Sequence, residues 1–495
     1  MVRRIVRLSG REASVAQLAA GFVRIRRELE IPEEFPPDVL AAATAASVQP
    51  TGDVGEVWAD LRDLDFVTVD PPGSTDLDQA MALRRRPGSD GGYQVDYAIA
   101  DVPAFVAPSS PIDRTARSRG QTLYAPDRRI PLHPPVLSEN AASLLPGQDR
   151  PAFVWRFELA VSGEVVGLDL VRALVRSRAR LDYAQVQQAA DAHPTPVAED
   201  AELLVRQAVL LREIGLARMD LERARGGASL PLPEQQVDAV DGHYRLVLRP
   251  ALASEDWNAQ LSLMTGMAAA TIMLDGGVGL LRTLPAPDPA ALERFRRQAG
   301  ALGVRWPSEQ SYGELLRSLR RDVPRELALM HEAGALFRGA GYTPLTPGAA
   351  PPAVTTHAAV AASYAHVTAP LRRLVDRFGL VTCHALVAGR PVPGWVLDAL
   401  GELPELMATS DHLAGQLERR STDLVEAAVL AHRVGQDFEA VVVDRNHSGI
   451  KVQLLDPAVL ASVRDPQGRA RIGHPVRVRL DAVDLDRGAV TFVVS

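Results

Sequence analysis

The chain has 495 residues, of which 46% are hydrophobic, 23% are charged and 5% are aromatic. This composition excludes a disordered, collagenous or coiled-coil chain, and the length predicts about two to four domains. The 61 acidic residues outnumber the 54 basic ones and leave a net charge of −7, which taken alone argues against a general nucleic-acid binder. All basic residues except Lys451 are arginine, the side chain best suited to phosphate contacts, although a GC-rich genome would produce the same bias.

Cysteine content and hydropathy bear on the cellular compartment. The single cysteine, Cys383, excludes an internal disulfide and a multi-cysteine zinc site, and it is typical of a reducing compartment. The first residues are basic, but no apolar run is long enough for a signal peptide or a membrane-spanning helix. We therefore expect a cytoplasmic protein that makes no membrane contact.

Two helices are expected in the first fifty residues. Apolar residues recur at helical spacing over 12–30, and a shorter helix that begins with proline is expected over 37–46. Residues 49–52 are typical of a linker. Residues 1–50 are therefore predicted to form a small helical module of the helix-turn-helix type, or alternatively a helical cap on the next domain.

The pattern then changes to strands and longer helices. Runs rich in valine, isoleucine and tyrosine, bounded by glycine and proline, predict strands over 65–70, 93–102 and 153–161. Helical spacing predicts helices over 199–225, 255–274, 370–390 and 404–433. The tail from 436 returns to short strands. We predict an α+β multidomain fold, divided into a helical module at 1–50, a mixed α/β core with trailing helices at 51–432 and an all-β unit at 433–495.

Three aspartates follow the first predicted strand. Asp70 closes that strand, and the next three residues are turn formers. Asp76 and Asp78 are two residues apart, so in extended backbone their carboxylates point to the same side. If the turn returns Asp70 toward them, three carboxylates gather and repel one another unless a cation is bound. Such oxygen ligands suit Mg²⁺ or Mn²⁺, which can activate water for phosphodiester cleavage. The alternative is an ordinary solvated turn.

Several longer segments resemble the catalytic core of the ribonuclease II (RNB) family. They are TVDPPGSTDLDQAM at 68–81, YAIADVPAFV at 97–106, PIDRTARSRGQTLYAP at 111–126, IPLHPPVLSENAASLLPGQDRPA at 130–152 and SYAHVTAPLRRLVDRF at 363–378. Their order and spacing match as well, and the likeness extends over about 30–390. The final segment is similar to the OB-fold RNA-binding barrel that closes many members. The resemblance implies an RNB catalytic core followed by an OB-fold domain.

The resemblance also implies an activity and a metal site. It implies a processive exoribonuclease that hydrolyses RNA from its 3′ end to nucleoside 5′-monophosphates, with one or two divalent ions, Mg²⁺ or Mn²⁺. Asp70, Asp76 and Asp78 match the first three of four acidic positions in the family, and Asp78 matches the one most critical for catalysis. Gln79 stands at the fourth position, where its uncharged amide is a weaker ligand, so one ion is expected to bind less tightly or through water.

Further residues match positions that contact RNA in the family. Arg372 matches the arginine that stabilises charge on the phosphate in the transition state, and Arg373 is a weaker candidate for a phosphate contact. Tyr124 matches the aromatic residue that stacks on the 3′-terminal base. Tyr183 matches a tyrosine near the terminal riboses. Gln260 falls where the family carries a glutamate that reads a ribose 2′-hydroxyl, a contact that an amide can also make.

Members of the family usually begin with two small cold-shock-type barrels, for which fifty residues leave too little room. We expect the arginine-bearing helical start to bind RNA in their place and to leave the channel open to structured RNA with a 3′ overhang. The expected partner is the 3′ end of single-stranded RNA, and the expected assembly is a monomer.

Two departures from the family keep alternatives open. Gln79 suggests an RNA-binding protein with a degenerate nuclease site, and Gln260 suggests a metal-dependent phosphodiesterase that is not restricted to RNA.

Overall fold

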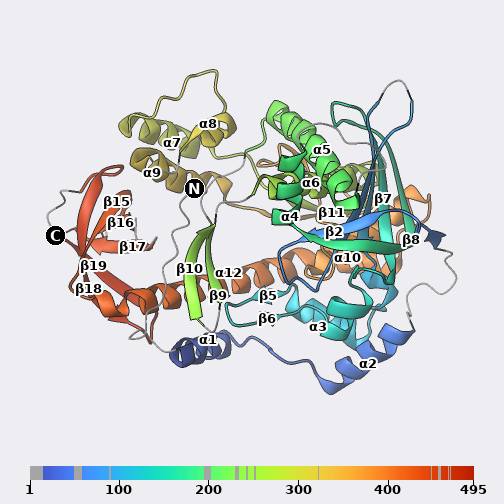
Figure 1. The fold of residues 1–495 in the computed structure, drawn as a ribbon, viewed down its shortest axis with the longest axis horizontal. Coiled ribbons are helices and arrows are strands. Elements are labelled where there is room, and N and C mark those ends of the chain that lie inside the picture. The colour runs from blue at the N-terminus through green and yellow to red at the C-terminus, as the bar shows by residue number, and fades with distance from the viewer. Residues whose placement is uncertain are drawn as a thin grey trace.

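The computed structural model describes most of the chain. Figure 1 shows a large α/β body, a small barrel near the C-terminus and one long helix, α12, between them. The described residues are 15–49, 58–88, 91–193, 202–228, 234–240, 243–249, 252–320, 323–446, 449–454, 459–465, 468 and 470–495.

A six-stranded sheet in the order β1–β8–β2–β3–β4–β7 forms the centre of the body. Its strands are β1 (Ala59–Asp60), β2 (Phe66–Asp70), β3 (Gln79–Arg85), β4 (Tyr93–Ala100), β7 (Asp149–Leu159) and β8 (Val165–Asp182). The long strand β8 pairs antiparallel with β7 and then parallel with β2, so the sheet curls back on itself. As a result, β8 ends at Asp182 directly beside the end of β2 at Asp70.

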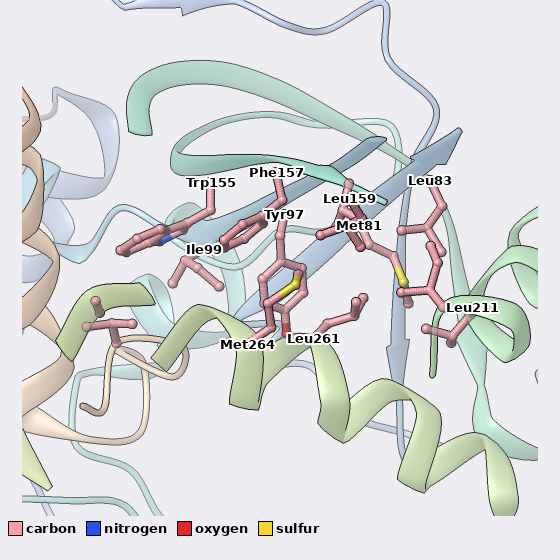
Figure 2. Close-up of a cluster of buried hydrophobic side chains, with 14 of the residues drawn as sticks. Met81, Leu83, Tyr97, Ile99, Trp155, Phe157, Leu159, Leu211, Leu261 and Met264 are labelled. Atoms are coloured by element: carbon pink, nitrogen blue, oxygen red, sulfur yellow. The ribbon is translucent and has the colours of Figure 1, made fainter. Parts of the chain in front are cut away.

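The two faces of this sheet carry side chains of different size. Because side chains alternate along a strand, Tyr97, Ile99 and Trp155 lie on one face, while Ala98 and Ala152 lie on the other. The face of large side chains is covered by four helices, which are α4 (Tyr183–Ala192), α5 (Leu203–Arg225), α6 (Ala253–Gly276) and α10 (Leu374–Val387). Figure 2 shows side chains of the sheet packed against Leu261 and Met264 of α6. Each large apolar side chain buried there contributes about 1.5–3 kcal/mol, which fixes α6 against the sheet.

Shorter elements cover the alanine-rich face. They are α2 (Pro37–Val48), η1 (Val102–Ala104), α3 (Pro111–Arg119) and η2 (Leu137–Ala141). A two-stranded ribbon of β5 (Leu123–Tyr124) and β6 (Arg129–Ile130) follows α3. The small alanine side chains allow these elements to approach the sheet closely.

A helical unit with its own core packs against the C-terminal barrel. Its core contains Phe295, Leu316 and Met330, and its helices are α7 (Pro289–Ala301), α8 (Tyr312–Ser318), α9 (Pro324–Ala333) and η3 (Gly334–Phe337). Three two-stranded ribbons lie nearby in the sequence, formed by β9 (Glu234–Val240) with β10 (His243–Arg249), β11 (Gly279–Thr283) with β12 (Gly341–Leu345), and β13 (Thr356–His357) with β14 (Ala362–Ser363).

The C-terminal segment forms a closed barrel, as predicted from the sequence. Three helices lead into it, α11 (Gly394–Ala399), α12 (Leu403–Leu430) and η4 (Ala431–Arg433). The barrel strands are β15 (Asp437–Asn446), β16 (Gly449–Leu454), β17 (Leu460–Arg464), β18 (Pro475–Asp484) and β19 (Ala489–Val494), joined in the order β15–β16–β17–β19–β18. Five strands in a closed barrel match the predicted OB-fold.

The two N-terminal helices differ from the predicted module. α1 (Val15–Glu28) buries Leu18 and Phe22 against Leu424 of α12 and the barrel, whereas α2 packs on α3 and η2. Each helix has one apolar face, and that face is covered by a different neighbour. Within the described residues, the two helices thus pack against different neighbours, and an RNA-binding module at 1–50 stays a prediction. Residues 1–14, which carry several of the predicted arginines, lie outside the described residues.

The longest helices carry polar and charged side chains along their length. α12 has 28 residues and α6 has 24. In the part of the chain that the structure describes, no helix is both long enough and apolar enough to cross a bilayer.

Candidate active site

A cavity of about 630 Å³ lies where β2 and β8 end and α4 begins. Its volume is within the range of about 300–1,000 Å³ that is usual for ligand sites. Of the nine residues predicted from the sequence, seven line it, namely Asp70, Asp76, Asp78, Gln79, Tyr124, Tyr183 and Arg372. Gln260 and Arg373 do not.

The loop after β2 places the three aspartates. Gly73 adopts a left-handed conformation with φ of 84°, which a residue with a side chain rarely adopts, and this turn reverses the chain after Asp70. Residues 74–78 then lead to the start of β3 without regular secondary structure. Leu77 points into the core, where it is fully buried, so Asp76 and Asp78 on either side of it point the other way, into the cavity. The predicted gathering of the three residues at one site is thus what the structure shows.

Asp78 is the most deeply buried of the three, with 5% of its surface exposed. Its Oδ1 accepts a hydrogen bond of 2.7 Å from the Leu371 amide, and its Oδ2 lies 3.5 Å from Nε of Arg372. Burial raises the pKa of Asp78 well above its ordinary value, and the positive charge of Arg372 opposes this only in part. Asp78 thereby holds the loop over 364–373, here called the motif loop, which carries Arg372, against the start of β3.

Asp70 has fewer partners than Asp78. Its Oδ2 is buried and has no hydrogen-bond partner. Burial raises the pKa of Asp70 to about 7, with Arg372 lowering it and Asp76 raising it further. A buried carboxylate oxygen that lacks a donor is costly unless a cation or a proton satisfies it. Asp70 and Asp78 therefore fit a divalent metal ion, which prefers such oxygens.

Asp76 already has a cation beside it. Arg129 of β6 forms an ion pair with Asp76 and a second one, of 2.6 Å, with Glu139. The sequence interpretation missed Arg129. The turn formers at 125–127 are a signal for a tight ribbon, and such a ribbon places residue 129 opposite Tyr124.

The amide of Gln79 is occupied by protein groups. Its Nε2 donates to the Thr368 carbonyl at 2.7 Å, and its Oε1 accepts from the Tyr97 hydroxyl at 2.5 Å. Oε1 also accepts from Ser262 at 3.3 Å. Through these hydrogen bonds the amide links β3, β4, α6 and the motif loop. A carboxylate at this position would have no N–H to donate to the Thr368 carbonyl. Metal coordination by Gln79 stays a prediction.

Two tyrosines flank the acidic floor. Tyr124 is 53% exposed and lies on the ribbon opposite Arg129, so part of its ring is free to stack on a base. Tyr183 is the first residue of α4, and its hydroxyl accepts from Nδ2 of Asn258 at 3.4 Å. Asn258, Ser262 and Tyr364 also line the cavity and were not identified from the sequence.

The two remaining predicted residues point elsewhere. Gln260 is 4% exposed, and its Nε2 donates to Glu222 of α5 at 2.6 Å. Arg373 is paired with Asp376 at 2.8 Å, on the first turn of α10. Gln260 is buried and Arg373 is partly exposed, and RNA contacts by these two residues stay a prediction.

The sequence matches two known domain families. The RNB domain matches residues 58–387, and the RNase II-type exonuclease C-terminal S1 domain matches residues 436–495. Ribonuclease R of Escherichia coli (strain K12) is 26% identical over 512 residues, which cover 94% of this chain and 61% of that protein. The chain thus spans about three fifths of the length of that relative.

Solved structures share the fold at low sequence identity. Mycoplasma genitalium RNase R in complex with ribose methylated single-stranded RNA has a TM-score of 0.84 at 18% identity, covering 97% of this chain and 78% of that chain. The same protein in complex with double-stranded RNA has a TM-score of 0.81 at 19% identity, covering 97% and 83%. Yeast Ssd1, a pseudonuclease, has a TM-score of 0.70 at 17% identity, covering 88% and 54%. With the RNB domain matching well over half of its residues, this chain belongs to the RNB family.

Proposed function

We propose that this chain is a processive 3′→5′ exoribonuclease that hydrolyses RNA to nucleoside 5′-monophosphates in the presence of Mg²⁺ or Mn²⁺. The observation that carries the proposal is the convergence of Asp70, Asp78 and Arg372 in one cavity with Tyr124 and Tyr183. Two buried acids, a cation and two aromatic rings are the groups needed to bind a metal ion, a phosphate and stacked bases.

Arg372 is the residue best placed to contact the scissile phosphate. Half of its side chain is exposed, and its Nε lies 3.5 Å from Oδ2 of Asp78. The remaining N–H groups of the guanidinium are able to donate to two phosphate oxygens. Because the hydrogen bond from Leu371 to Asp78 fixes the adjacent backbone, Arg372 is held in position before the substrate arrives.

Asp70 and Asp78 would hold the metal ion, and Asp76 lies beside them. A bound Mg²⁺ or Mn²⁺ supplies a water molecule of lowered pKa and neutralises charge on the phosphate. The chain itself holds both carboxylates in a site that is shielded from bulk water. The lower dielectric constant of that site strengthens their attraction for a cation. The chain also aligns the substrate through the rings of Tyr124 and Tyr183, each stacked base contributing about 1–3 kcal/mol.

The proposal is tested with 5′-labelled RNA and DNA oligomers of the same sequence, incubated with Mg²⁺, with Mn²⁺ or with a chelator. We expect metal-dependent shortening of the RNA to a short end product, with release of nucleoside 5′-monophosphates. Equal attack on the DNA would favour the phosphodiesterase that is not restricted to RNA. Oligonucleotides without the 5′ label as the first released products, in place of nucleoside 5′-monophosphates, would contradict an exonuclease.

The occupied amide of Gln79 favours one second candidate, an RNA-binding protein that does not cleave. In this chain a neutral side chain stands at an acidic position of the family, and its oxygen is already hydrogen-bonded. RNA binding without any shortening, in either metal and at high enzyme concentration, would support this candidate and overturn the first.

Finer features of the substrate and of the assembly are further proposals. We propose that RNA duplexes with a short 3′ overhang are accepted, and that the protein acts as a cytoplasmic monomer. The fold shared with a structure of RNase R in complex with double-stranded RNA supports the first of these. Digestion of a hairpin with a short 3′ tail tests it, since a stop several nucleotides before the stem would contradict it. Light scattering of the purified chain tests the monomer.

A further inference from the structure

Arg129 is the centre of a compact charged cluster on the cavity wall. It forms ion pairs with Asp76 and Glu139, and its guanidinium donates to the Thr75 hydroxyl at 3.1 Å. The Thr75 hydroxyl in turn donates to Glu139 at 3.1 Å. Arg129 is about three-quarters buried, so both ion pairs are partly shielded from water. The guanidinium is therefore held at one place in the cavity and does not move freely.

This cluster changes which aspartates are available to a divalent ion. The Oδ1 atom of Asp76 is occupied by the guanidinium, whereas Oδ2 of Asp70 is buried without a partner. Asp78 shares the cavity, and among the described residues the side-chain cation paired with it is Arg372, at 3.5 Å. Within the described ranges, no three histidine, cysteine, aspartate or glutamate side chains converge on a single metal position. Of the three aspartates, two are thus left for one ion and the third is turned toward an arginine. Glu255 also lines the cavity, where it accepts a hydrogen bond from the Leu252 amide.

Electrostatics then disfavours a second divalent ion. A cation that approached Asp76 would lie next to the Arg129 guanidinium, and two positive charges at such a separation repel strongly in a partly buried site. Gln79, at the end of the same loop, adds no negative charge to offset that repulsion, and both ends of its amide are hydrogen-bonded. A second ion would have to displace Arg129 from Asp76 and also leave Glu139 without its cation.

We propose that Arg129 is a fixed monovalent cation in place of a second metal ion, so that this site binds a single divalent ion through Asp70 and Asp78. The inference rests on the metal site of the proposed function but not on RNA hydrolysis, because ion binding can be measured without RNA. Arg129 is then a positioning residue, which holds Asp76 and sets the number of ions.

The experiment counts Mn²⁺ ions bound to the metal-free full-length chain, using electron paramagnetic resonance of the free ion together with calorimetry. We expect one ion per chain for the wild type, for Arg129→Lys, which keeps the charge, and for Arg128→Met. Arg128 is the matched control, since it is the adjacent arginine but pairs with Glu33 away from the cavity. Arg129→Met is expected to bind two ions, because it frees Asp76.

A second set of variants keeps the proposal open to contradiction if Arg129→Met does not fold. In the wild-type background, Asp76→Asn should leave the affinity for the single ion within about threefold, whereas Asp70→Asn should weaken it by more than about tenfold. Two ions bound to the wild type, or a loss of affinity in Asp76→Asn as large as in Asp70→Asn, would overturn the inference while leaving the nuclease proposal intact. Absence of Mn²⁺ binding to the wild type would overturn both.

Discussion

Two regions of the described chain that bury acids, one outside the cavity and one within it, differ in what surrounds the carboxylates. Outside the cavity, Asp101 pairs with Arg172 at 2.7 Å, and Asp113 of α3 pairs with Arg377 of α10 at 2.5 Å. In the cavity, Asp70 keeps an oxygen without a partner. The first region supplies each carboxylate with a buried arginine, and the second does not.

The pKa values follow from this difference. Burial alone raises the pKa of Asp113, but Arg377 and the Ser109 amide outweigh it and bring the pKa below its ordinary value. Burial raises the pKa of Asp70 to about 7, because Arg372 offsets it only in part. A carboxylate that the protein buries without a full set of donors lowers stability, so such a group is a candidate for function. The paired acids hold the fold together, and the cavity acids are left able to bind a cation.

The largest expected effect separates chemistry from binding at Asp78. Asp78→Asn should slow RNA hydrolysis by about 10³-fold or more, because the amide is a poor metal ligand and carries no charge. RNA binding should change little, since Tyr124 and Arg372 remain. Single-turnover rates and fluorescence anisotropy measure the two quantities. Asp65→Asn, an exposed acid paired with Arg206, is the matched control and should retain the wild-type rate. A hydrolysis rate of Asp78→Asn within tenfold of the wild-type rate would contradict the assignment of Asp78 to the active site.

The next effect concerns the paired acid Asp113. Asp113→Asn should lower the free energy of unfolding by about 3 kcal/mol, because it leaves the guanidinium of Arg377 buried without a counter-charge. Urea denaturation at neutral pH measures this. Since the pKa of Asp113 is lower in the folded state than in the unfolded chain, its contribution is present above about pH 4 and is lost as the pH falls through the folded pKa. Asp60→Asn, in an exposed pair, should have little effect.

A smaller effect of opposite sign is expected at Asp70. Its pKa is about 7 in the folded chain and about 3.9 when unfolded, so its proton stabilises the metal-free fold below about pH 4 and this stabilisation is lost as the pH rises through 7. Asp70→Asn should therefore be more stable than the wild type at pH 8 in chelator, by roughly 1–3 kcal/mol, and about equally stable at pH 4. Urea unfolding at both pH values tests this. A variant less stable than the wild type at pH 8 would contradict it.

The site was predictable where it depends on local geometry. The alternation of side chains in extended backbone places Asp76 and Asp78 on one side, and the buried Leu77 between them confirms this. The helices over 203–225 and 253–276 and the C-terminal barrel were likewise indicated by periodicity and turn residues. These features depend on neighbours in the sequence, which a pattern of residue types records.

The partners of each polar group were not predictable in the same way. The orientation of the Gln79 amide is fixed by its hydrogen bond to the Thr368 carbonyl, which lies 289 residues later in the sequence. The ion pair between Arg129 and Asp76 spans 53 residues. Residue type alone does not reveal which distant group will be brought near. The N-terminal helices show the same limit, since their apolar faces are evident in the sequence but the surfaces that cover them are not.

The smallest expected effect on function concerns Gln260, which the family resemblance placed at a ribose contact. At 3.6 residues per turn, Asn258 and Ser262 share the cavity side of α6, while Gln260 points toward α5 and Glu222. Gln260→Met should therefore leave the ratio of RNA to DNA cleavage rates within about twofold, although the loss of the hydrogen bond to Glu222 costs about 1–2 kcal/mol of stability. Asn258→Ala is the comparison variant on the cavity side, where weaker binding of the RNA end is expected. A tenfold fall in RNA preference for Gln260→Met would show that the side chain turns toward the substrate, and that this buried pair belongs with the cavity residues after all.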